Sequence, residues 1–215
     1  MQILLCAATE FEIKPVIDFI KSKNLTNTRT LITGIGLAAA AYQITKAVYL
    51  QKPQLIIQAG IAGSLDNRFP LKKVVVVKND TIGDIGVEEN GSFNSLFDLQ
   101  LDGRDTFPWT NGQLCNRSEI LNQLNFSTVN SVTVNEISTN KKRIEYYKNN
   151  LKASIECMEG AALHYVGLME NIPFLQIRSL SNFVGERDKD KWQIKEAISN
   201  LNLELQRLIS KLTDV

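Results

Sequence analysis

The sequence predicts an α/β fold, with a single-domain, three-layer arrangement in which helices flank a central mixed, largely parallel β-sheet. Two observations support this prediction. Short aliphatic and β-branched runs alternate with helical patterns along the chain, as in parallel strands joined by crossover helices. Most of these runs are apolar throughout, as expected for strands that are covered on both faces. With 215 residues, 44% of them hydrophobic, the chain is long enough for one well-buried core, so we expect one domain over residues 1–215.

The expected elements follow from these patterns in chain order. Apolar runs predict strands at residues 3–6, 29–33, 54–58, 74–77, 131–134, 153–157 and 174–180. Helical periodicity predicts helices at residues 10–23, 37–50, 140–149, 159–170 and 190–212. The last helix carries an apolar stripe that packs on the sheet or on a partner. Residues 79–113 hold many Gly, Asn and Asp residues, which indicates a loop-rich middle.

Charge and the chain start restrict the function classes. The formal net charge is +1, from 24 basic and 23 acidic residues, so no overall field favours nucleic acid or an anionic membrane. The start "MQILLCAATEFEIKPV" lacks a basic n-region and soon becomes acidic, unlike a signal peptide. No segment approaches the roughly 18 consecutive apolar residues of a spanning helix. We expect a cytoplasmic protein with a small-molecule partner.

The cysteines and the histidine indicate no metal or disulfide framework. Cys6, Cys115 and Cys157 are odd in number and far apart, as in buried, reduced thiols. His164 is the only histidine and cannot form a zinc site with cysteines so scattered. We therefore expect no metal and no cofactor.

The segment "GIGLAA", residues 34–39, matches the G-x-G-x-x-A form of a dinucleotide fingerprint. A nicotinamide site also needs an acidic residue at the end of the next strand, but that strand ends in Gln58, Ala59 and Gly60. The segment therefore favours a different ligand. Its glycines allow amides at a helix start to face a small anion or a sugar.

Three polar residues follow predicted strands, where ligands gather in open α/β sheets. Glu159 in "ECMEGAA" is either an ordinary first-turn acid or a partly desolvated carboxylate that binds paired hydroxyls. Glu12 is either a solvated acid at a helix start or part of the same site. Asn182 in "RSLSN" is either a turn residue or a group that faces the ligand.

Taken together, the segments "AATEFEI", "TGIGLAAAA", "AGIAGS", "ECMEGAA" and "RSLSN" resemble the purine nucleoside phosphorylase and nucleosidase superfamily. The resemblance covers almost the whole chain and implies a nucleoside phosphorylase-like fold. It also implies cleavage of N-ribosyl bonds without redox cofactor or metal, by a homo-oligomer whose neighbouring subunits often complete the site. Within the superfamily, "IGDIGVEENGSF", "SVTVNEIS" and "SNFVGERDKDKW" resemble the futalosine hydrolase branch.

The resemblance implies roles for ten residues. The proposed catalytic group is Glu12, which positions and deprotonates water, Arg178 near that water, and Asn182, which holds the N7 edge of the purine. The proposed substrate contacts are Glu159 at the ribose hydroxyls, Met158 beneath the sugar, Ser181 as the support of Asn182, and Gly60, Ile61, Asn135 and Ile137. Ile61 departs from the pattern, because related nucleosidases often carry a serine there.

These roles predict hydrolysis of a 6-oxopurine nucleoside. An amide at position 182 can accept a bond from N7–H and donate one to a 6-oxo group, whereas the aspartate of adenine-releasing nucleosidases suits a 6-amino group. Glu10 and Glu12 would repel phosphate, which favours water as the nucleophile. A methylthioadenosine or adenosylhomocysteine nucleosidase and a catalytically silent nucleoside-binding protein are the alternatives. The cluster Arg187, Lys189 and Lys191 is either a solvated helix start or a site for an acidic substituent.

Overall fold

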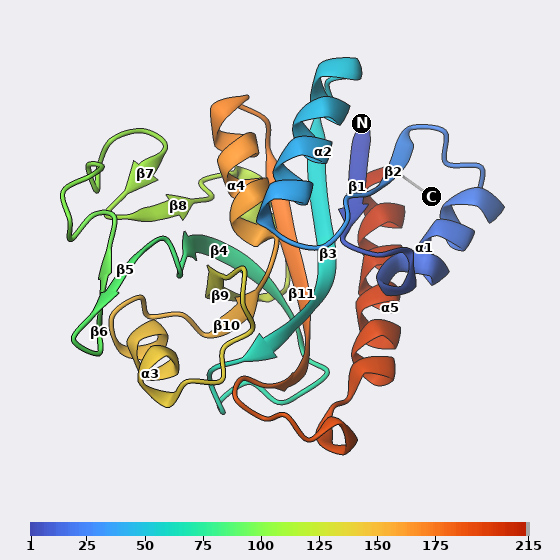
Figure 1. Cartoon of the computed structure of the whole chain (residues 1–215). Coiled ribbons are helices and arrows are strands. Elements are labelled where there is room, and N and C mark those ends of the chain that lie inside the picture. The colour runs from blue at the N-terminus through green and yellow to red at the C-terminus, as the bar shows by residue number, and fades with distance from the viewer. Residues whose placement is uncertain (214–215) are drawn as a thin grey trace.

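The structure is a computed structural model that describes residues 1–213 (Figure 1). The strands are β1 (Ile3–Ala7), β2 (Thr28–Ile32), β3 (Leu55–Ser64), β4 (Val74–Ile82), β5 (Gly86–Glu89), β6 (Ser92–Ser95), β7 (Trp109–Thr110), β8 (Gln113–Cys115), β9 (Ser127–Thr133), β10 (Ile155–Cys157) and β11 (Phe174–Phe183). The helices are α1 (Glu10–Ser22), α2 (Leu37–Leu50), α3 (Lys141–Asn149), α4 (Gly160–Met169) and α5 (Ile194–Thr213), with short 3-10 helices η1 (Glu119–Gln123) and η2 (Lys189–Lys191).

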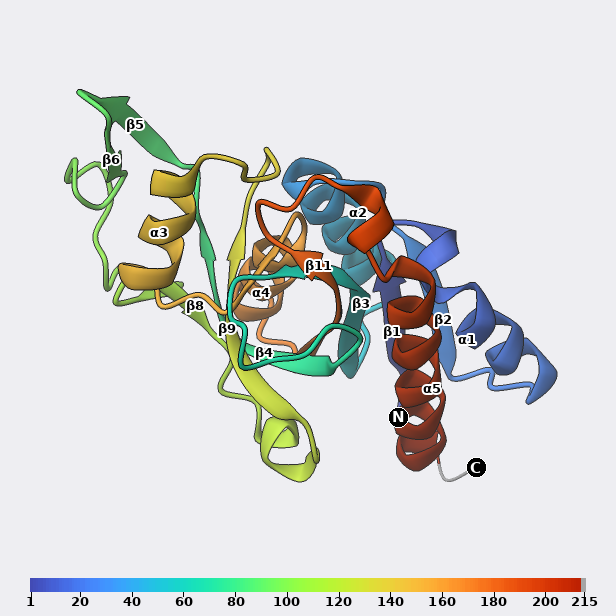
Figure 2. The same ribbon diagram turned by 90° about the horizontal axis from the view of Figure 1, so that it is seen from below.

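Nine of these strands form one mixed sheet, which confirms the predicted fold class. β1 pairs in parallel with β2 and β3, and β11 pairs in parallel with β3. β11 also pairs with β4, in antiparallel orientation, while β9 and β10 connect β4 to β3. The sheet therefore closes into a ring of five strands, β3, β10, β9, β4 and β11. This ring lies beside the flat part of the sheet, in which β2, β1 and β3 pair in parallel (Figure 2).

Helices cover the two faces of the flat part of the sheet (Figure 1). Alternate residues of β1 point to opposite faces, as in any strand. Leu5 packs with the buried residues of α1 and α5 in one core cluster. Leu4 and Cys6 pack with α2 and α4 in another. The apolar stripe of α5 therefore packs on the sheet, which is one of the two arrangements that the sequence left open.

The middle of the chain is more ordered than predicted. β4 does not end at Val77 but continues to Ile82, and residues 86–95 form a hairpin of β5 and β6. Asn79 and Asp80 suggested a loop because they are polar, yet both lie in the ladder with β9. Asn79 Nδ2 donates to Asn130 Oδ1 at 3.0 Å, and Thr133 Oγ1 donates to Asp80 Oδ1 at 2.8 Å. Partners distant in sequence thus satisfy polar groups that local patterns assign to a loop.

Three other predicted boundaries are wrong for a related reason. β3 runs to Ser64 and β11 to Phe183, beyond the predicted ends at Gln58 and Leu180. The small and polar residues that were expected to follow these two strands are part of the strands themselves. α5 begins at Ile194, since η2 takes up the first residues of the predicted helix.

Candidate active site

A cavity of about 370 Å³ lies where the starts of α1 and α4 meet β3, β10 and β11. Its wall contains seven of the ten residues that the sequence analysis selected: Glu12, Ile61, Ile137, Met158, Glu159, Ser181 and Asn182. These residues are separated by up to 170 positions in the sequence, so only the fold brings them together. A mostly apolar cavity with a few convergent polar groups is the usual form of a small-molecule site.

Glu12 is held in the first turn of α1 by donors from two elements. Its Oε2 accepts hydrogen bonds from the backbone N–H of Thr9 at 3.1 Å and from the Thr9 hydroxyl at 3.0 Å. Its Oε1 accepts from the backbone N–H of Ile61 in β3 at 3.1 Å. Thr9 and Glu12 form a capping box at the helix start. The T-x-x-E spacing was visible in the sequence and would have linked these two residues.

Glu159 is also almost fully buried, with 6% of its surface exposed. Its Oε1 accepts a hydrogen bond from the backbone N–H of Gly36 at 3.1 Å. Gly36 precedes α2 and has a φ of 92°, in the region that favours glycine. The glycine segment that resembled a dinucleotide fingerprint therefore directs an amide at a carboxylate of its own chain.

Arg178 lies behind the cavity wall and not in it. Its side chain is 1% exposed, and its Nη2 donates to Gln58 Oε1 at 2.7 Å and lies 3.8 Å from Glu159 Oε2. A Cβ at Gly60 would overlap Arg178 Nη1 and would lie 2.8 Å from Glu12 Oε1. Gly60 therefore allows the guanidinium to lie close to both carboxylates.

Asn182 lies in β11 beside a bulge and is oriented by its neighbours. The hydroxyl of Ser181 donates to Asn182 Oδ1 at 2.7 Å, and Asn182 Nδ2 donates to the carbonyl of Phe183 at 3.1 Å. An amide oxygen has two lone pairs and an amide nitrogen has two hydrogens. One acceptor position and one donor position of Asn182 thus stay free for a ligand.

Asn135, like Arg178 and Gly60, does not line the cavity. It is exposed, and both its backbone N–H and its side-chain Nδ2 donate to the carboxylate of Asp84, at 2.6 and 3.2 Å. Ile137, two residues further on, does line the cavity. The segment that joins β9 to α3 thus contributes Ile137 to the wall and anchors itself through Asn135.

Several cavity residues escaped the sequence analysis. Phe11 and Ile35 are exposed apolar residues of the wall, and Glu156 is a buried acid in β10. Trp192 also lies in the wall, although the sequence analysis gave it no role of its own. Arg187, which the sequence analysis left open, lies in the wall with its guanidinium 5.3 Å from the centre of the Trp192 ring. These residues lie within segments that carry the family resemblance, but, apart from Arg187, no local pattern gave any of them a role of its own.

Cys157 also lines the cavity but is unsuited to nucleophilic attack. Its sulfur lies 3.4 Å from the Ser131 hydroxyl and 3.5 Å from the Thr133 hydroxyl. Burial raises the pKa of the Cys157 thiol above its ordinary value of 9.0, so the thiolate is scarce at neutral pH. The polar groups of the cavity wall are therefore its carboxylates, the amide of Asn182, the hydroxyls of Thr9 and Ser181, and the guanidinium of Arg187.

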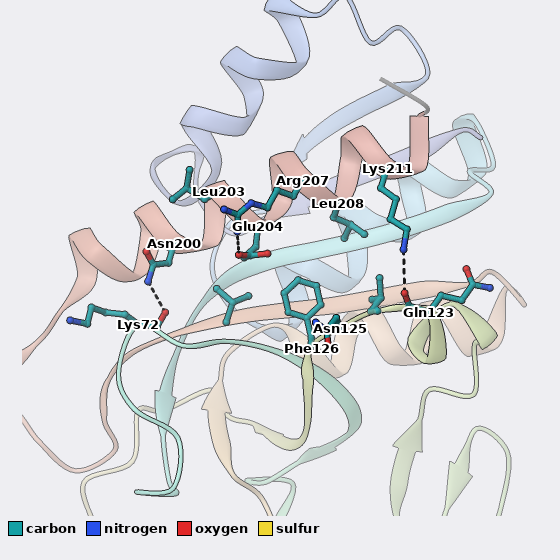
Figure 3. Close-up of a pocket in the computed structure, with 12 residues that line it drawn as sticks. Lys72, Gln123, Asn125, Phe126, Asn200, Leu203, Glu204, Arg207, Leu208 and Lys211 are labelled. Atoms are coloured by element: carbon teal, nitrogen blue, oxygen red, sulfur yellow. Dashed lines mark hydrogen bonds and ion pairs between the residues drawn. The ribbon is translucent and has the colours of Figure 1, made fainter.

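A larger hollow of about 650 Å³ lies between α5 and residues 123–126 (Figure 3). Its polar groups are largely bonded to one another: Arg207 pairs with Glu204, and Lys211 donates to the carbonyl of Gln123. Asn200 donates to the carbonyl of Lys72. Among the described residues that line this hollow there is no pair of buried carboxylates like Glu12 and Glu159. We therefore place the candidate site in the cavity of about 370 Å³.

The structure shows an α/β protein with a mostly apolar cavity into which a few polar side chains converge. Comparison with known proteins identifies the family: residues 11–215 match the model of the phosphorylase superfamily, to which the chain belongs. Futalosine hydrolase of Thermus thermophilus is 28% identical over 184 residues, which cover 84% of this chain and 80% of the relative. 5'-Methylthioadenosine/S-adenosylhomocysteine nucleosidase of Buchnera aphidicola is 26% identical over 204 residues, covering 85% and 84%.

Solved structures agree with this assignment of the fold. The structure of futalosine hydrolase of Helicobacter pylori superposes with a TM-score of 0.80 at 16% sequence identity, covering 97% of each chain. No helix within residues 1–213 combines the length and the apolar character that crossing a membrane requires.

Proposed function

We propose that the chain is an N-ribosyl hydrolase that cleaves futalosine with water, releasing hypoxanthine and dehypoxanthine futalosine in menaquinone biosynthesis. The observation that carries this proposal is the amide of Asn182 in the cavity wall, with its oxygen held by Ser181. The free lone pair of Oδ1 accepts N7–H of the departing base, and the free hydrogen of Nδ2 bonds to its 6-oxo group. A 6-amino group would place two donors face to face, at a cost of about 1 to 3 kcal/mol.

The two buried glutamates serve the sugar and the water. Glu159 accepts bonds from the ribose hydroxyls and stabilises the positive charge that develops on the sugar, while Met158 packs beneath the ring. Glu12 takes a proton from a water whose oxygen bonds to the anomeric carbon. The bond to the purine nitrogen breaks and its electron pair stays with the base, whose N7 takes a proton from solvent water. Glu12 then returns to solvent the proton that it took from the attacking water. Arg178 positions both glutamates from behind.

Water, not phosphate, is the proposed nucleophile. The backbone and hydroxyl donors around Glu12 already bond to its carboxylate, and the segment after β1 supplies this acid, not a cation, to the wall. A carboxylate at this place repels a phosphate dianion. Ile61 replaces a serine of related nucleosidases with an apolar side chain, yet its backbone N–H bonds to Glu12, so the position still contributes to the site.

The non-purine end of futalosine carries a benzoate, and the rim of the cavity fits such a group. Lys191 pairs with Glu186 at 2.8 Å, which leaves Arg187 as the cationic side chain in the cavity wall of the described chain. The indole N–H of Trp192 donates to the carbonyl of Glu186 at 3.1 Å, which holds the ring beneath the guanidinium. An arginine on an aromatic face suits an aromatic carboxylate.

We also propose that the whole chain works as one domain, in the cytoplasm, as a homo-oligomer. Phe11 and Ile35 lie in the cavity wall although each is 64% exposed, and Tyr42 on α2 is equally exposed. An apolar rim of this kind is typical of a surface that another chain covers.

The test is to incubate the purified protein with futalosine and, separately, with methylthioadenosine, each with and without phosphate, and to identify the released base by chromatography. We expect hypoxanthine from futalosine, at a rate that does not depend on phosphate. Release of adenine would favour the methylthioadenosine nucleosidase. Tight binding of nucleoside without release of any base would favour the silent binding protein.

A further inference from the structure

Glu156 is a third buried acid of the cavity wall, and the proposed mechanism does not use it. Its side chain is 6% exposed. Oε1 accepts a hydrogen bond from the backbone N–H of Ser138 at 3.1 Å, whereas Oε2 is buried without any hydrogen-bond partner. Buried acceptors are normally bonded, so an unpartnered carboxylate oxygen beside a ligand cavity calls for a donor that arrives with the ligand.

The sheet register places Glu156 and Asn182 on either side of Gly63. Gly63 of β3 pairs with Glu156 of β10 and, across the other edge of β3, with Asn182 of β11. Neighbouring strands lie about 4.8 Å apart, so the two backbones are roughly 10 Å apart. Directly opposed residues of paired strands point to the same face, and all three residues line the cavity.

Gly63 keeps the floor between these two side chains bare. A Cβ at this position would lie 2.7 Å from Val184 Cγ2 and 3.7 Å from Asn182 Nδ2. With no side chain there, a flat ring can lie over β3 with one edge toward Asn182 and the adjoining edge toward Glu156.

The chemistry of the purine edge matches this arrangement. In a 6-oxopurine, N7 and the 6-oxo group are followed around the ring by N1–H, which is a donor. In a 6-aminopurine, N1 is an acceptor. An ionised carboxylate only accepts hydrogen bonds, so it favours the first base and opposes the second.

We propose that Glu156 is a specificity-determining residue that binds N1–H of a 6-oxopurine base through Oε2. This inference rests on the proposed function, because it places the base between Asn182 and Glu156. Since Oε2 is shielded from solvent, the base reaches it only when the exposed side chain of Ile137 in the same wall turns aside. Ile137 is 46% exposed, whereas Ser138 is 7% exposed and keeps its bond to Oε1.

A purely structural role, in which Glu156 only fastens Ser138, is the rival explanation. Burial raises the pKa of the Glu156 carboxyl, and the nearby Asp84 raises it further, while the bonds from Ser138 lower it. Glutamine separates the two roles. In Glu156→Gln the amide oxygen still accepts from Ser138, but a donor NH2 group replaces Oε2.

The experiment measures the binding of hypoxanthine and of adenine to the full chain by calorimetry, without turnover. We expect the wild type to prefer hypoxanthine and Glu156→Gln to lower the ratio of the two affinities at least tenfold. Glu156→Asp, which keeps an acceptor, should still prefer hypoxanthine. The control Glu136→Gln changes an exposed acid in the segment that joins β9 to α3. It should leave the ratio of the two affinities unchanged.

A ligand analogue makes the test independent of whether the variants fold. The wild type should bind 1-deazahypoxanthine, which has C–H in place of N1–H, at least tenfold more weakly than hypoxanthine. Equal binding of the two ligands, or an affinity ratio in folded Glu156→Gln within twofold of the wild type, would overturn the inference. Either result leaves the proposed hydrolysis of futalosine standing, since the assay of the released base tests that activity separately.

Discussion

Carboxylates are buried in two regions of this molecule, the cavity and the interior of the ring, and they are held in different ways. At the cavity, backbone N–H groups of Thr9 and Ile61 bond to Glu12, and that of Gly36 bonds to Glu159. In the interior, Asp80 is fully buried, and a hydroxyl, that of Thr133, donates to it. Burial raises the pKa of Asp80 to about 6, although bonds from Thr133 and other side chains oppose the shift.

His164 is, like Asp80, a fully buried group whose pKa is shifted by burial toward the neutral form. Its Nδ1 lies 2.9 Å from the carbonyl of Leu114, while its Nε2 is buried without a partner. Burial lowers the pKa of His164 to about 4, so the ring is neutral near pH 7. Backbone donors from separate elements thus fix the orientation of the cavity glutamates, whereas burial drives Asp80 and His164 toward their neutral forms.

The largest effect should come from Glu12, the proposed general base. In Glu12→Gln we expect kcat for base release to fall about 10²- to 10⁴-fold, because an amide cannot take a proton from water. Hypoxanthine should still bind, as calorimetry can check. Glu10→Gln, an exposed acid in the same helical turn, is the control and should keep full activity. Turnover within tenfold of the wild type in Glu12→Gln would remove Glu12 from the mechanism.

Asp80 should affect stability, and its effect should depend on pH. Its pKa is about 6 in the folded chain and 3.8 as an unperturbed group, so between these values the folded state binds more protons than the unfolded state. The stability of the wild type therefore falls as pH rises from about 4 to 6, by roughly 3 kcal/mol in total. Asp80→Asn removes this titrating group. The free energy of unfolding of the variant minus that of the wild type should therefore rise by roughly 3 kcal/mol between pH 4 and pH 6.

Urea unfolding of the two proteins at pH 4 and pH 7 measures this difference. The neutral His164 loses stability as pH falls, through a pKa lowered to about 4 from 6.5, but it does so in both proteins and cancels in the comparison. Asp190→Asn, a change at an exposed acid, is the control and should show a flat difference. A flat difference for Asp80→Asn as well would mean that water or a cation reaches the interior.

Asn182 should change the choice of base by a smaller amount. Asn182→Asp replaces the donor NH2 with an acceptor, so preference should move toward 6-amino nucleosides by about 1 to 3 kcal/mol, or one to two powers of ten in relative kcat/KM. Asn67→Asp, at an exposed loop position, controls for the added charge. An unchanged preference in Asn182→Asp would refute this account of base choice.

The contrast between the two regions also explains what the sequence could and could not predict. Apolar runs marked seven of the eleven strands in the described chain. Polar residues such as Gln58 and Asp80 hid how far β3 and β4 continue, because their hydrogen-bond partners come from strands far along the chain. Glu12 and Glu159 were recognisable by motif, since each stands at a helix start. Glu156 was not, because its meaning depends on its register beside Gly63, a relation between strands that no local pattern encodes.

Thr9 should give the smallest effect and the finest test of how the cavity carboxylate is held. Its hydroxyl donates to Glu12 Oε2, beside the bonds from two backbone N–H groups. Thr9→Ala should lower the free energy of unfolding by about 1 kcal/mol, the usual value of a helix cap. Thr9→Ser keeps the hydroxyl and should restore most of that stability in urea unfolding.

The kinetic result for Thr9→Ala then decides which donors orient Glu12. If the backbone N–H groups of Thr9 and Ile61 hold the Glu12 carboxylate, kcat of Thr9→Ala should fall less than tenfold, although its free energy of unfolding is lower. A loss of activity as large as that of Glu12→Gln would instead mean that the side-chain hydroxyl sets the geometry. The cavity would then resemble the interior of the ring, where side chains alone hold Asp80, and the distinction between the two regions would not stand.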